Sequence, residues 1–247
     1  KGVVLILTAG EETGCDGAKI LCKNPELLGR AGAIVVGEPT SNKPLIGHKG
    51  ALWLKAIAKG VTAHGSTPEL GVNAVYEACR AVGEVEKFRF HEEPHKVIGS
   101  PSLNVGRIKG GINVNSVPDH AEFDIDIRSI PSQQHQQIIS NLQQHMNSDI
   151  ALETTVDVGS VVSNFSDSWI QNVYQCVGEI LGAPQQEATA KYFTDASVLA
   201  PAFGNPPTII LGPGDAAIAH KTDEYCELDK LYQSVEMYKA IIKQWVL

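Results

Sequence analysis

The stretch VVLILTAGEETG, residues 3–14, places two adjacent carboxylates, Glu11 and Glu12, directly after an uninterrupted apolar run. A short apolar run that ends in a glycine-containing turn is typical of a strand buried on both faces of a parallel sheet. Two like charges at the end of such a strand repel each other, and their desolvation costs free energy that a cation would offset. The stretch therefore predicts a buried strand at residues 3–8 with a chemical site at its carboxyl end.

Composition narrows the classes of protein to which the chain can belong. The chain has 247 residues, of which 43% are hydrophobic, so it can bury one large core or two smaller ones. The formal net charge of −8 disfavours a nucleic-acid-binding protein, which needs a basic face. The sequence shows no run of about 18 apolar residues and no signal-peptide pattern, so we expect neither a membrane span nor secretion. The five cysteines form no Cys-x-x-Cys pair, which favours reduced thiols in a cytoplasmic protein.

The two ends of the chain share an α/β pattern. Near the start, strand, helix and strand follow each other with short connections, which is typical of a doubly wound sheet. The same pattern resumes after residue 160. The predicted elements are strands at 3–8, 33–36 and 208–211, and helices at 14–28, 168–181 and from Leu228 onward.

The middle of the chain, residues 47–160, changes to an α+β pattern. Residues 120–128 (HAEFDIDIR) alternate between apolar and acidic side chains, which predicts a strand with one buried face and one wet face. The order of elements, βαββαβ, is that of a ferredoxin-like unit. We therefore predict a doubly wound α/β domain in two segments, residues 1–46 and 161–247, interrupted by an inserted ferredoxin-like domain, residues 47–160. The expected strands of the insert are 51–58, 102–109, 120–128 and 152–158, and its expected helices are 71–88 and 132–147.

Acidic residues follow more than one of the apolar strands. Glu38 follows the second predicted strand, as Glu11 and Glu12 follow the first. His220 lies shortly after the strand at 208–211. Ligands of open α/β sheets gather at the carboxyl ends of the strands, so these four side chains are expected to converge. Such oxygen and nitrogen donors suit zinc, manganese or cobalt, although each residue taken alone is also consistent with a solvated loop.

Six motifs occur in order along nearly the whole chain: TAGEETG, VVGEPTSNKPLIGHKG, TAHGSTPELGVNAV, GGINVNSVPDHAEFDIDIR, FTDASVLA and LGPGDAAIAHKTDEYCEL. Together they resemble the acetylornithine deacetylase, succinyl-diaminopimelate desuccinylase and aminoacylase family of dinuclear zinc hydrolases. The resemblance implies a zinc-exopeptidase-like catalytic domain with an inserted dimerisation or lid domain. It also implies hydrolysis of the amide bond of an N-acyl amino acid or small peptide. The succession of GEPT and HKG is similar to the acetylornithine deacetylase branch in particular.

The resemblance implies catalytic and metal-binding roles for the matching residues. Glu11 would be the general base that moves a proton from water to the leaving amine. His64 would reach from a partner subunit to stabilise the developing oxyanion. Glu12 and His220 would bind one zinc ion and Glu38 a second, with cobalt or manganese as alternatives.

The resemblance also implies a set of substrate contacts. Arg128 and Asn115 match a clamp for a substrate carboxylate, which leaves the acyl group and the amine open. An ion pair between Arg128 and Asp126 or Asp124 is the alternative for that arginine. His48, in the HKG motif, is expected to be structural or to line the interdomain cleft. The remaining expected substrate contacts are Thr194, Gly212 and Gly214.

Members of the resembled family carry a His-x-Asp motif and a further aspartate ahead of the strand with which this sequence opens. We therefore expect the chain to be the C-terminal portion of a longer hydrolase that alone binds zinc weakly and hydrolyses little. The alternative is a non-catalytic dimerisation or binding module that keeps the fold without metals. In either case we expect a homodimer through the insert, because its helices and edge strand offer a self-complementary surface.

Overall fold

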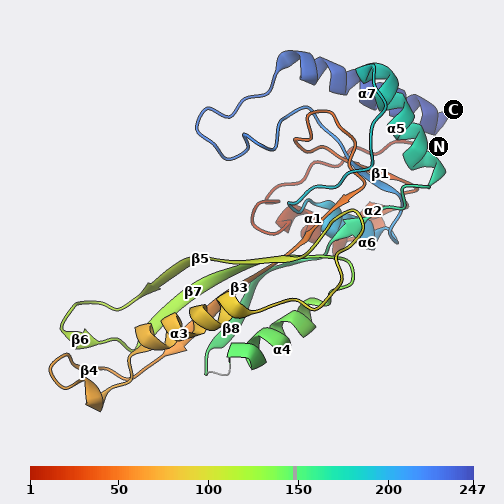
Figure 1. Ribbon diagram of the computed structural model, residues 1–247. Coiled ribbons are helices and arrows are strands. Elements are labelled where there is room, and N and C mark those ends of the chain that lie inside the picture. Colours follow the sequence, from red (N-terminus) through yellow and green to blue (C-terminus); the bar gives the residue numbers. More distant parts are fainter. Residues whose placement is uncertain (147–148) are drawn as a thin grey trace. The chain divides into compact units, whose positions relative to one another are not determined.

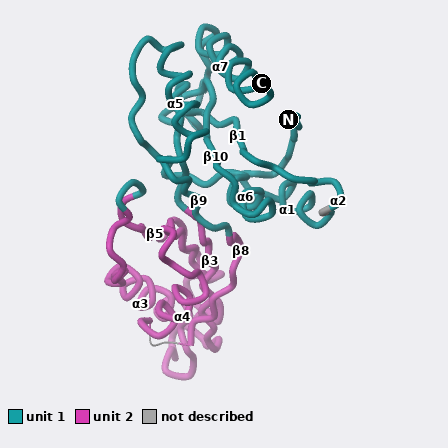
Figure 2. Tube along the Cα trace, turned by 90° about the vertical axis from the view of Figure 1, so that its right-hand side faces the viewer, with its two compact units in different colours: residues 1–49, 96–98, 158–247 teal, residues 50–95, 99–157 magenta. Residues whose placement is uncertain are grey.

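The computed structural model describes residues 1–146 and 149–247 (Figure 1). The chain divides into two compact units (Figure 2). Unit 1 consists of residues 1–49, 96–98 and 158–247, and unit 2 consists of residues 50–95 and 99–157. The sequence places its domain limits at 46/47 and 160/161, and that assignment stays a prediction.

Unit 2 has the predicted βαββαβ order, and its four long strands form one sheet in the order β5-β7-β3-β8. This order confirms the ferredoxin-like fold and places the first and last strands of the unit side by side. Two short strands form a separate pair: β4, which follows β3, and β6, which precedes β7. The bounds are β3 Gly50–Lys59, β4 Ala63–His64, 3₁₀-helix η1 Pro68–Leu70, α3 Ala74–Lys87, β5 Ser102–Gly110, β6 Ser116–Val117, β7 His120–Ser129, α4 His135–Met146 and β8 Ala151–Val158.

The core of unit 2 lies between the sheet and the helices α3 and α4 (Figure 1). Alternation along β7 turns Phe123, Ile125 and Ile127 to this face, where each is at most 1% exposed. Leu142 of α4 packs in the same cluster and is fully buried. The opposite face carries ion pairs across the strands, such as Arg107 with Asp124 at 2.7 Å. The predicted contrast between a buried and a polar face of this strand is confirmed.

A hydrogen-bonded relay joins Ser129, His135 and Asp157 where β7, α4 and β8 meet. Ser129 Oγ lies 2.7 Å from His135 Nε2, and His135 Nδ1 lies 2.6 Å from Asp157 Oδ1. The arrangement resembles a catalytic triad in its contacts. Ser129 is only 1% exposed, however, so its hydroxyl is closed to a substrate in solvent. These hydrogen bonds therefore stabilise the packing of β7, α4 and β8 at this end of the sheet.

Unit 1 contains two short strand pairs and five helices among the described residues. β1 pairs in parallel with β10, and β2 pairs in antiparallel with β9. Helix α5 begins where the Asp167 carboxylate accepts hydrogen bonds from Trp169 N and Ile170 N, and it ends at Gly182 in a left-handed conformation. The bounds are α1 Asp16–Cys22, α2 Pro25–Leu28, β1 Ile34–Val36, β2 Gly47–His48, β9 Val161–Val162, α5 Ser168–Leu181, α6 Ala196–Ala202, β10 Thr208–Ile210 and α7 Leu228–Val246.

The core of unit 1 forms where α5 and α7 pack on the β10 region. Ile170 and Val173 of α5 and Met237 of α7 are fully buried there, as are Ile209 and Leu211. These positions follow the helical repeat, so each helix turns one apolar stripe to the strands. Within residues 1–146 and 149–247, no helix combines the length and the apolar character needed to cross a membrane.

Two predicted elements of unit 1 are wrong. Residues 3–8 form no strand, and Val4, Leu5 and Leu7 are 80%, 82% and 87% exposed. A strand needs a neighbour for its backbone hydrogen bonds, and no described strand pairs with this stretch. The predicted helix at 14–28 is divided into α1 and α2, because a proline at position 25 disfavours helical backbone at the preceding residue, Asn24.

The predicted helix at 132–147 begins later than expected, at His135. Ile130 and Gln133 form a turn in which Gln133 N donates to Ile130 O at 3.0 Å, and this turn delays the helix. Its predicted last residue, Asn147, lies outside the described residues.

His48 in β2 is a buried histidine of unit 1. Its Nδ1 lies 2.7 Å from the carbonyl oxygen of Lys49, and its Nε2 has no hydrogen-bond partner among the described residues. Because burial disfavours the charged ring, the pKa of His48 falls from 6.5 to about 4. The histidine is therefore neutral and structural in the folded unit.

We predict that Leu142→Ala lowers the free energy of unfolding by about 2–5 kcal/mol, because it leaves a cavity between α4 and the sheet. Urea denaturation monitored by circular dichroism measures the change. The matched control is Leu70→Ala, which truncates a leucine that is 71% exposed and should change the free energy by less than about 0.5 kcal/mol. Equal effects of the two variants would contradict the assigned core.

We predict that His48 makes unfolding dependent on pH between pH 6.5 and about 4. In this range the unfolded chain binds a proton that the folded unit does not, so the free energy of unfolding falls as the pH falls, by up to about 1.4 kcal/mol per pH unit. His48→Gln should flatten this part of the stability curve, whereas the control His91→Gln, at an exposed site, should leave the slope intact. An unchanged slope in His48→Gln would show that proton binding by this ring does not differ between the folded and unfolded states.

Candidate active site

The turn at residues 8–17 fixes the two adjacent glutamates. The carbonyl oxygen of Glu11 accepts hydrogen bonds from Gly14 N and Cys15 N, each at 2.9 Å. A Cβ on Gly17 would lie 2.6 Å from the carbonyl oxygen of Ala9, so only glycine lets α1 begin against this turn. As a result Glu11 is half-buried while Glu12 extends into solvent.

Glu38 is held by the loops that follow β1 and β10. The parallel pairing of these strands continues through a hydrogen bond from Leu211 N to Val36 O at 2.9 Å. A Cβ on Gly212 would lie 2.4 Å from Glu38 O, and one on Gly214 would lie 2.9 Å from Pro39 Cβ. Both glycines therefore allow the two loops to approach each other closely, and their expected contact with a substrate stays a prediction.

The structure brings Glu12 and His220 together from opposite ends of the chain. His220 Nε2 lies 3.5 Å from Glu12 Oε1, and both side chains are more than 70% exposed. His220 adopts a left-handed backbone conformation with φ of 62°, and its N–H donates to Glu224 Oε2 at 2.9 Å. Glu12 and His220 are thus two predicted metal ligands whose side chains are in direct contact.

Glu38 is coupled to the same cluster through its charge. Burial raises its pKa to about 7, and the negative charges of Asp195 and Glu12 add to the effect. Three carboxylates thus crowd into one region of unit 1, where a cation would stabilise their ionised forms. Crowded acids whose pKa values are raised by burial and like charge are frequent at functional sites.

The donors described here do not complete a metal site. Glu12 and His220 are donors of the kind that zinc accepts, but catalytic zinc sites use three protein ligands. Within residues 1–146 and 149–247, no group of three histidine, cysteine, aspartate or glutamate side chains could hold a metal ion. The expected zinc site at Glu12, Glu38 and His220 therefore stays a prediction.

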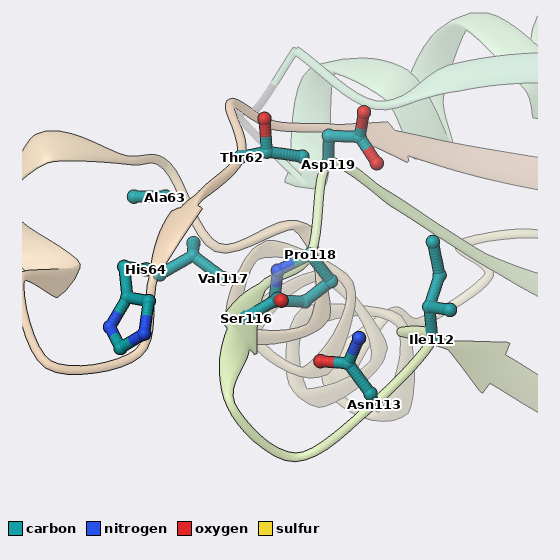
Figure 3. Close-up of a pocket in the computed structure, with 9 residues that line it drawn as sticks. All are labelled: Thr62, Ala63, His64, Ile112, Asn113, Ser116, Val117, Pro118 and Asp119. Carbon is teal, nitrogen blue, oxygen red and sulfur yellow. The ribbon is translucent and has the colours of Figure 1, made fainter.

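His64 and Asn115 lie together at the β4–β6 pair of unit 2. His64 pairs with Ser116 across the strands, and Gly65 N donates to Asn115 O at 2.8 Å. Ser66 N donates to His64 Nδ1 at 3.1 Å, so the neutral ring carries its proton on Nε2 and can donate a hydrogen bond outward. A hollow of about 360 Å³ adjoins these strands, and Figure 3 shows His64, Asn113 and Ser116 among the residues that line it.

Arg128 and Thr194 occupy surroundings that differ from their expected roles. Arg128 Nε lies 2.9 Å from Asp126 Oδ1, and the guanidinium lies 5.9 Å from the centre of the Trp53 ring. This is the ion pair that the sequence offers as the alternative to a substrate clamp. Thr194 is fully buried, and its hydroxyl accepts a hydrogen bond from Ala196 N at 3.1 Å. Substrate contacts by both residues, and by Asn115, stay predictions.

The structure also adds two residues that the sequence patterns do not single out, Tyr192 and Asp195. Tyr192 lies near Glu38 and Glu11, whose charges, after burial, help to raise the pKa of its phenol to about 12. Asp195 is 7% exposed and accepts a short hydrogen bond from Thr8 Oγ1. The motif FTDASVLA contains Asp195. The pattern of residues in this motif does not indicate that Thr8, near the start of the chain, is the hydrogen-bond partner of Asp195.

Comparisons with known proteins show what the chain is similar to. Residues 46–152 match the peptidase dimerisation domain of the M20 family. The chain is 28% identical to a probable succinyl-diaminopimelate desuccinylase of Staphylococcus epidermidis, in an alignment that covers 98% of this chain and 67% of the relative. It is 30% identical to an acetylornithine deacetylase of Shigella sonnei, over 98% of this chain and 64% of the relative. The chain thus spans about two thirds of the length of these curated relatives.

Solved structures show the same fold. An M20 family metallo-carboxypeptidase from Sulfolobus solfataricus superposes with a TM-score of 0.75 at 15% sequence identity, covering 94% of this chain and 68% of that one. At this identity the likeness concerns the fold alone. It confirms the α/β architecture with an inserted α+β domain.

We predict that neutral His64 carries its proton on Nε2, because the backbone N–H of Ser66 donates to Nδ1. Two-dimensional ¹⁵N NMR of the imidazole nitrogens at a pH where the ring is neutral distinguishes the two tautomers. Ser66→Ala removes the hydroxyl and keeps the backbone donor, so it should leave the tautomer unchanged. Finding the proton on Nδ1 would contradict the assigned geometry of the β4–β6 turn.

Proposed function

We propose that the chain belongs to a metal-dependent amidohydrolase related to the M20 metallopeptidases and deacylases. The reaction would cleave the amide bond of an N-acyl amino acid or a small peptide. The observation that carries the proposal is the contact of Glu12 with His220 at 3.5 Å beside the half-buried Glu11. These residues, distant in sequence, meet in one region of unit 1, where the charge of Glu12 also acts on Glu38 in the loop after β1.

Glu11 would serve as the general base. Its carboxylate is held by a turn that is fixed at both ends, so it can take a proton from an attacking water and give it to the leaving amine. Glu12 and His220 would hold one divalent ion, zinc by preference, and Glu38 would hold a second. Bound ions would supply the positive charge that acidifies water and polarises the amide carbonyl. Cobalt or manganese could replace zinc with the same donors.

His64 would act as a hydrogen-bond donor to the developing oxyanion. The network at Ser66 turns Nε2–H away from the β4–β6 turn, as a donor needs. We propose that this histidine serves the site of a partner copy in a homodimer formed through the insert. The match of residues 46–152 to a dimerisation domain and the edge position of β5 in the sheet support this assembly.

Substrate contacts would come from Arg128, Asn115, Thr194, Gly212 and Gly214. Arg128 already pairs with Asp126, so a substrate carboxylate would join or displace that pair. The names of the curated relatives suggest acetylornithine and succinyl-diaminopimelate as first substrates. Acyl amino acids and dipeptides complete the panel.

We predict that Glu11→Gln lowers kcat about 10²- to 10⁴-fold on the best substrate of this panel, because the variant cannot accept the proton. The rate of amine release is measured for the wild-type and variant proteins supplied with zinc. Elemental analysis should show that the two proteins have the same metal content. The control Glu26→Gln, at an exposed position of α2, should leave kcat unchanged. A wild-type protein that neither retains metal nor hydrolyses any substrate would instead support a non-catalytic dimerisation or binding module.

A further inference from the structure

The segment Tyr192–Asp195, which leads into α6, contacts both carboxylate-bearing parts of the site. We propose that Tyr192 and Asp195 are positioning residues, which hold the Glu11–Glu12 turn and Glu38 in fixed relation to each other. The proposal rests on the function proposed above and assigns a role to side chains that neither the motifs nor the comparisons single out. All of the residues involved lie in unit 1.

The first set of contacts holds the Glu11–Glu12 turn at both ends. Ahead of the glutamates, Thr8 Oγ1 donates a short hydrogen bond to Asp195 Oδ2. Beyond them, Cys15 Sγ donates to the carbonyl oxygen of Thr194 at 3.5 Å. Burial raises the pKa of the Cys15 thiol, which therefore stays protonated and able to donate. The turn is thus fixed to this one segment on either side of its two carboxylates.

The second contact holds the loop that carries Glu38. Tyr192 Oη donates to the carbonyl oxygen of Pro39 at 3.3 Å, one residue after Glu38. The phenol stays neutral because burial and the charges of Glu38 and Glu11 raise its pKa to about 12, so the donor is present at any physiological pH. Tyr192 therefore fixes the Pro39–Thr40 peptide, one residue after Glu38, in the loop that carries this glutamate.

Asp195 is the centre of this arrangement. Its carboxylate is 7% exposed, and its second oxygen, Oδ1, has no hydrogen-bond partner among the described residues. Leaving a buried polar atom unpaired costs stability, so the side chain is not explained by packing alone. Its hydrogen bond from Thr8, in the same short segment whose Tyr192 donates to Pro39, explains it as part of the link between the two acidic segments.

Loss of these hydrogen bonds should change the rate of the reaction more than the stability of the fold. A general base works only within hydrogen-bond reach of its proton, and a displacement of about 1 Å can lower a rate about 10²-fold. Loss of either contact should move Glu11 or Glu38 without opening the cores of the unit. The two side chains should therefore affect kcat more than KM.

The test compares two pairs of variants of the wild-type protein, each pair consisting of a test substitution and a matched control. Tyr192→Phe is matched by Tyr174→Phe, which removes another tyrosine hydroxyl that donates to a proline carbonyl, Pro44 O at 2.7 Å, away from the acidic cluster. Asp195→Ala is matched by Asp167→Ala, which removes the carboxylate that begins α5. We expect Tyr192→Phe and Asp195→Ala to lower kcat about 10- to 100-fold with KM within about twofold, and both controls to lower only the melting temperature.

A conservative variant and a second measurement separate positioning from general stability. Asp195→Asn keeps an acceptor for Thr8 and should recover most of kcat, whereas Thr8→Val should reproduce the loss if Asp195→Ala fails to fold. Amide hydrogen exchange at residues 14–16 should become about tenfold faster in Asp195→Ala, with α5 unchanged. If kcat and exchange in the test variants match those of the controls, the positioning role is overturned. Absence of hydrolysis in the wild type would refute the proposed function, and the exchange measurement would still decide the inference.

Discussion

The candidate site depends on how closely two loops approach each other after the parallel strands β1 and β10. The backbone of Gly212 passes so near Glu38 that any side chain at position 212 would overlap the Glu38 carbonyl, at 2.4 Å from a Cβ. The contact is reinforced by Thr40, whose N–H donates to Gly212 O at 3.2 Å and whose hydroxyl accepts from Gly212 N at 3.1 Å. The approach holds Glu38 where the charges of Asp195 and Glu12 add to the effect of burial in raising its pKa.

The acidic cluster combines electrostatic strain with a rigid frame. Glu38 carries a raised pKa because burial and neighbouring carboxylates disfavour its ionised form. Such crowding is unfavourable in a bare protein and becomes favourable when a cation lies among the oxygens. The hydrogen bonds from Tyr192 and Thr8 hold the acids in place, so the arrangement is prepared before any ion or substrate arrives.

Sequence patterns predict most elements of unit 2 and fewer details of unit 1. The alternation at residues 120–128 specifies β7 and its buried face, because one side of that strand packs under α3 and α4. Residues 3–8 carry an equally apolar pattern, but strand formation also requires a neighbour that local sequence does not reveal. Glu11, Glu12 and Glu38 are found because each follows an apolar run in the sequence. Tyr192 and Asp195 are not, because their partners Pro39 and Thr8 lie far away along the chain.

The topology of the insert also bears on how the chain could have been assembled. β3 and β8, where unit 2 begins and ends, are neighbours in one sheet, and just outside them β2 pairs in antiparallel with β9. Entry and exit therefore adjoin, as in a domain that can be acquired or lost as one block. A tight hairpin turn from β2 to β9 would suffice to seal the host where the block was excised. The described strand pairings of the two units share no strand, so either unit could change without breaking the strand pairing of the other, but residues 96–98 of unit 1 would have to be kept or replaced.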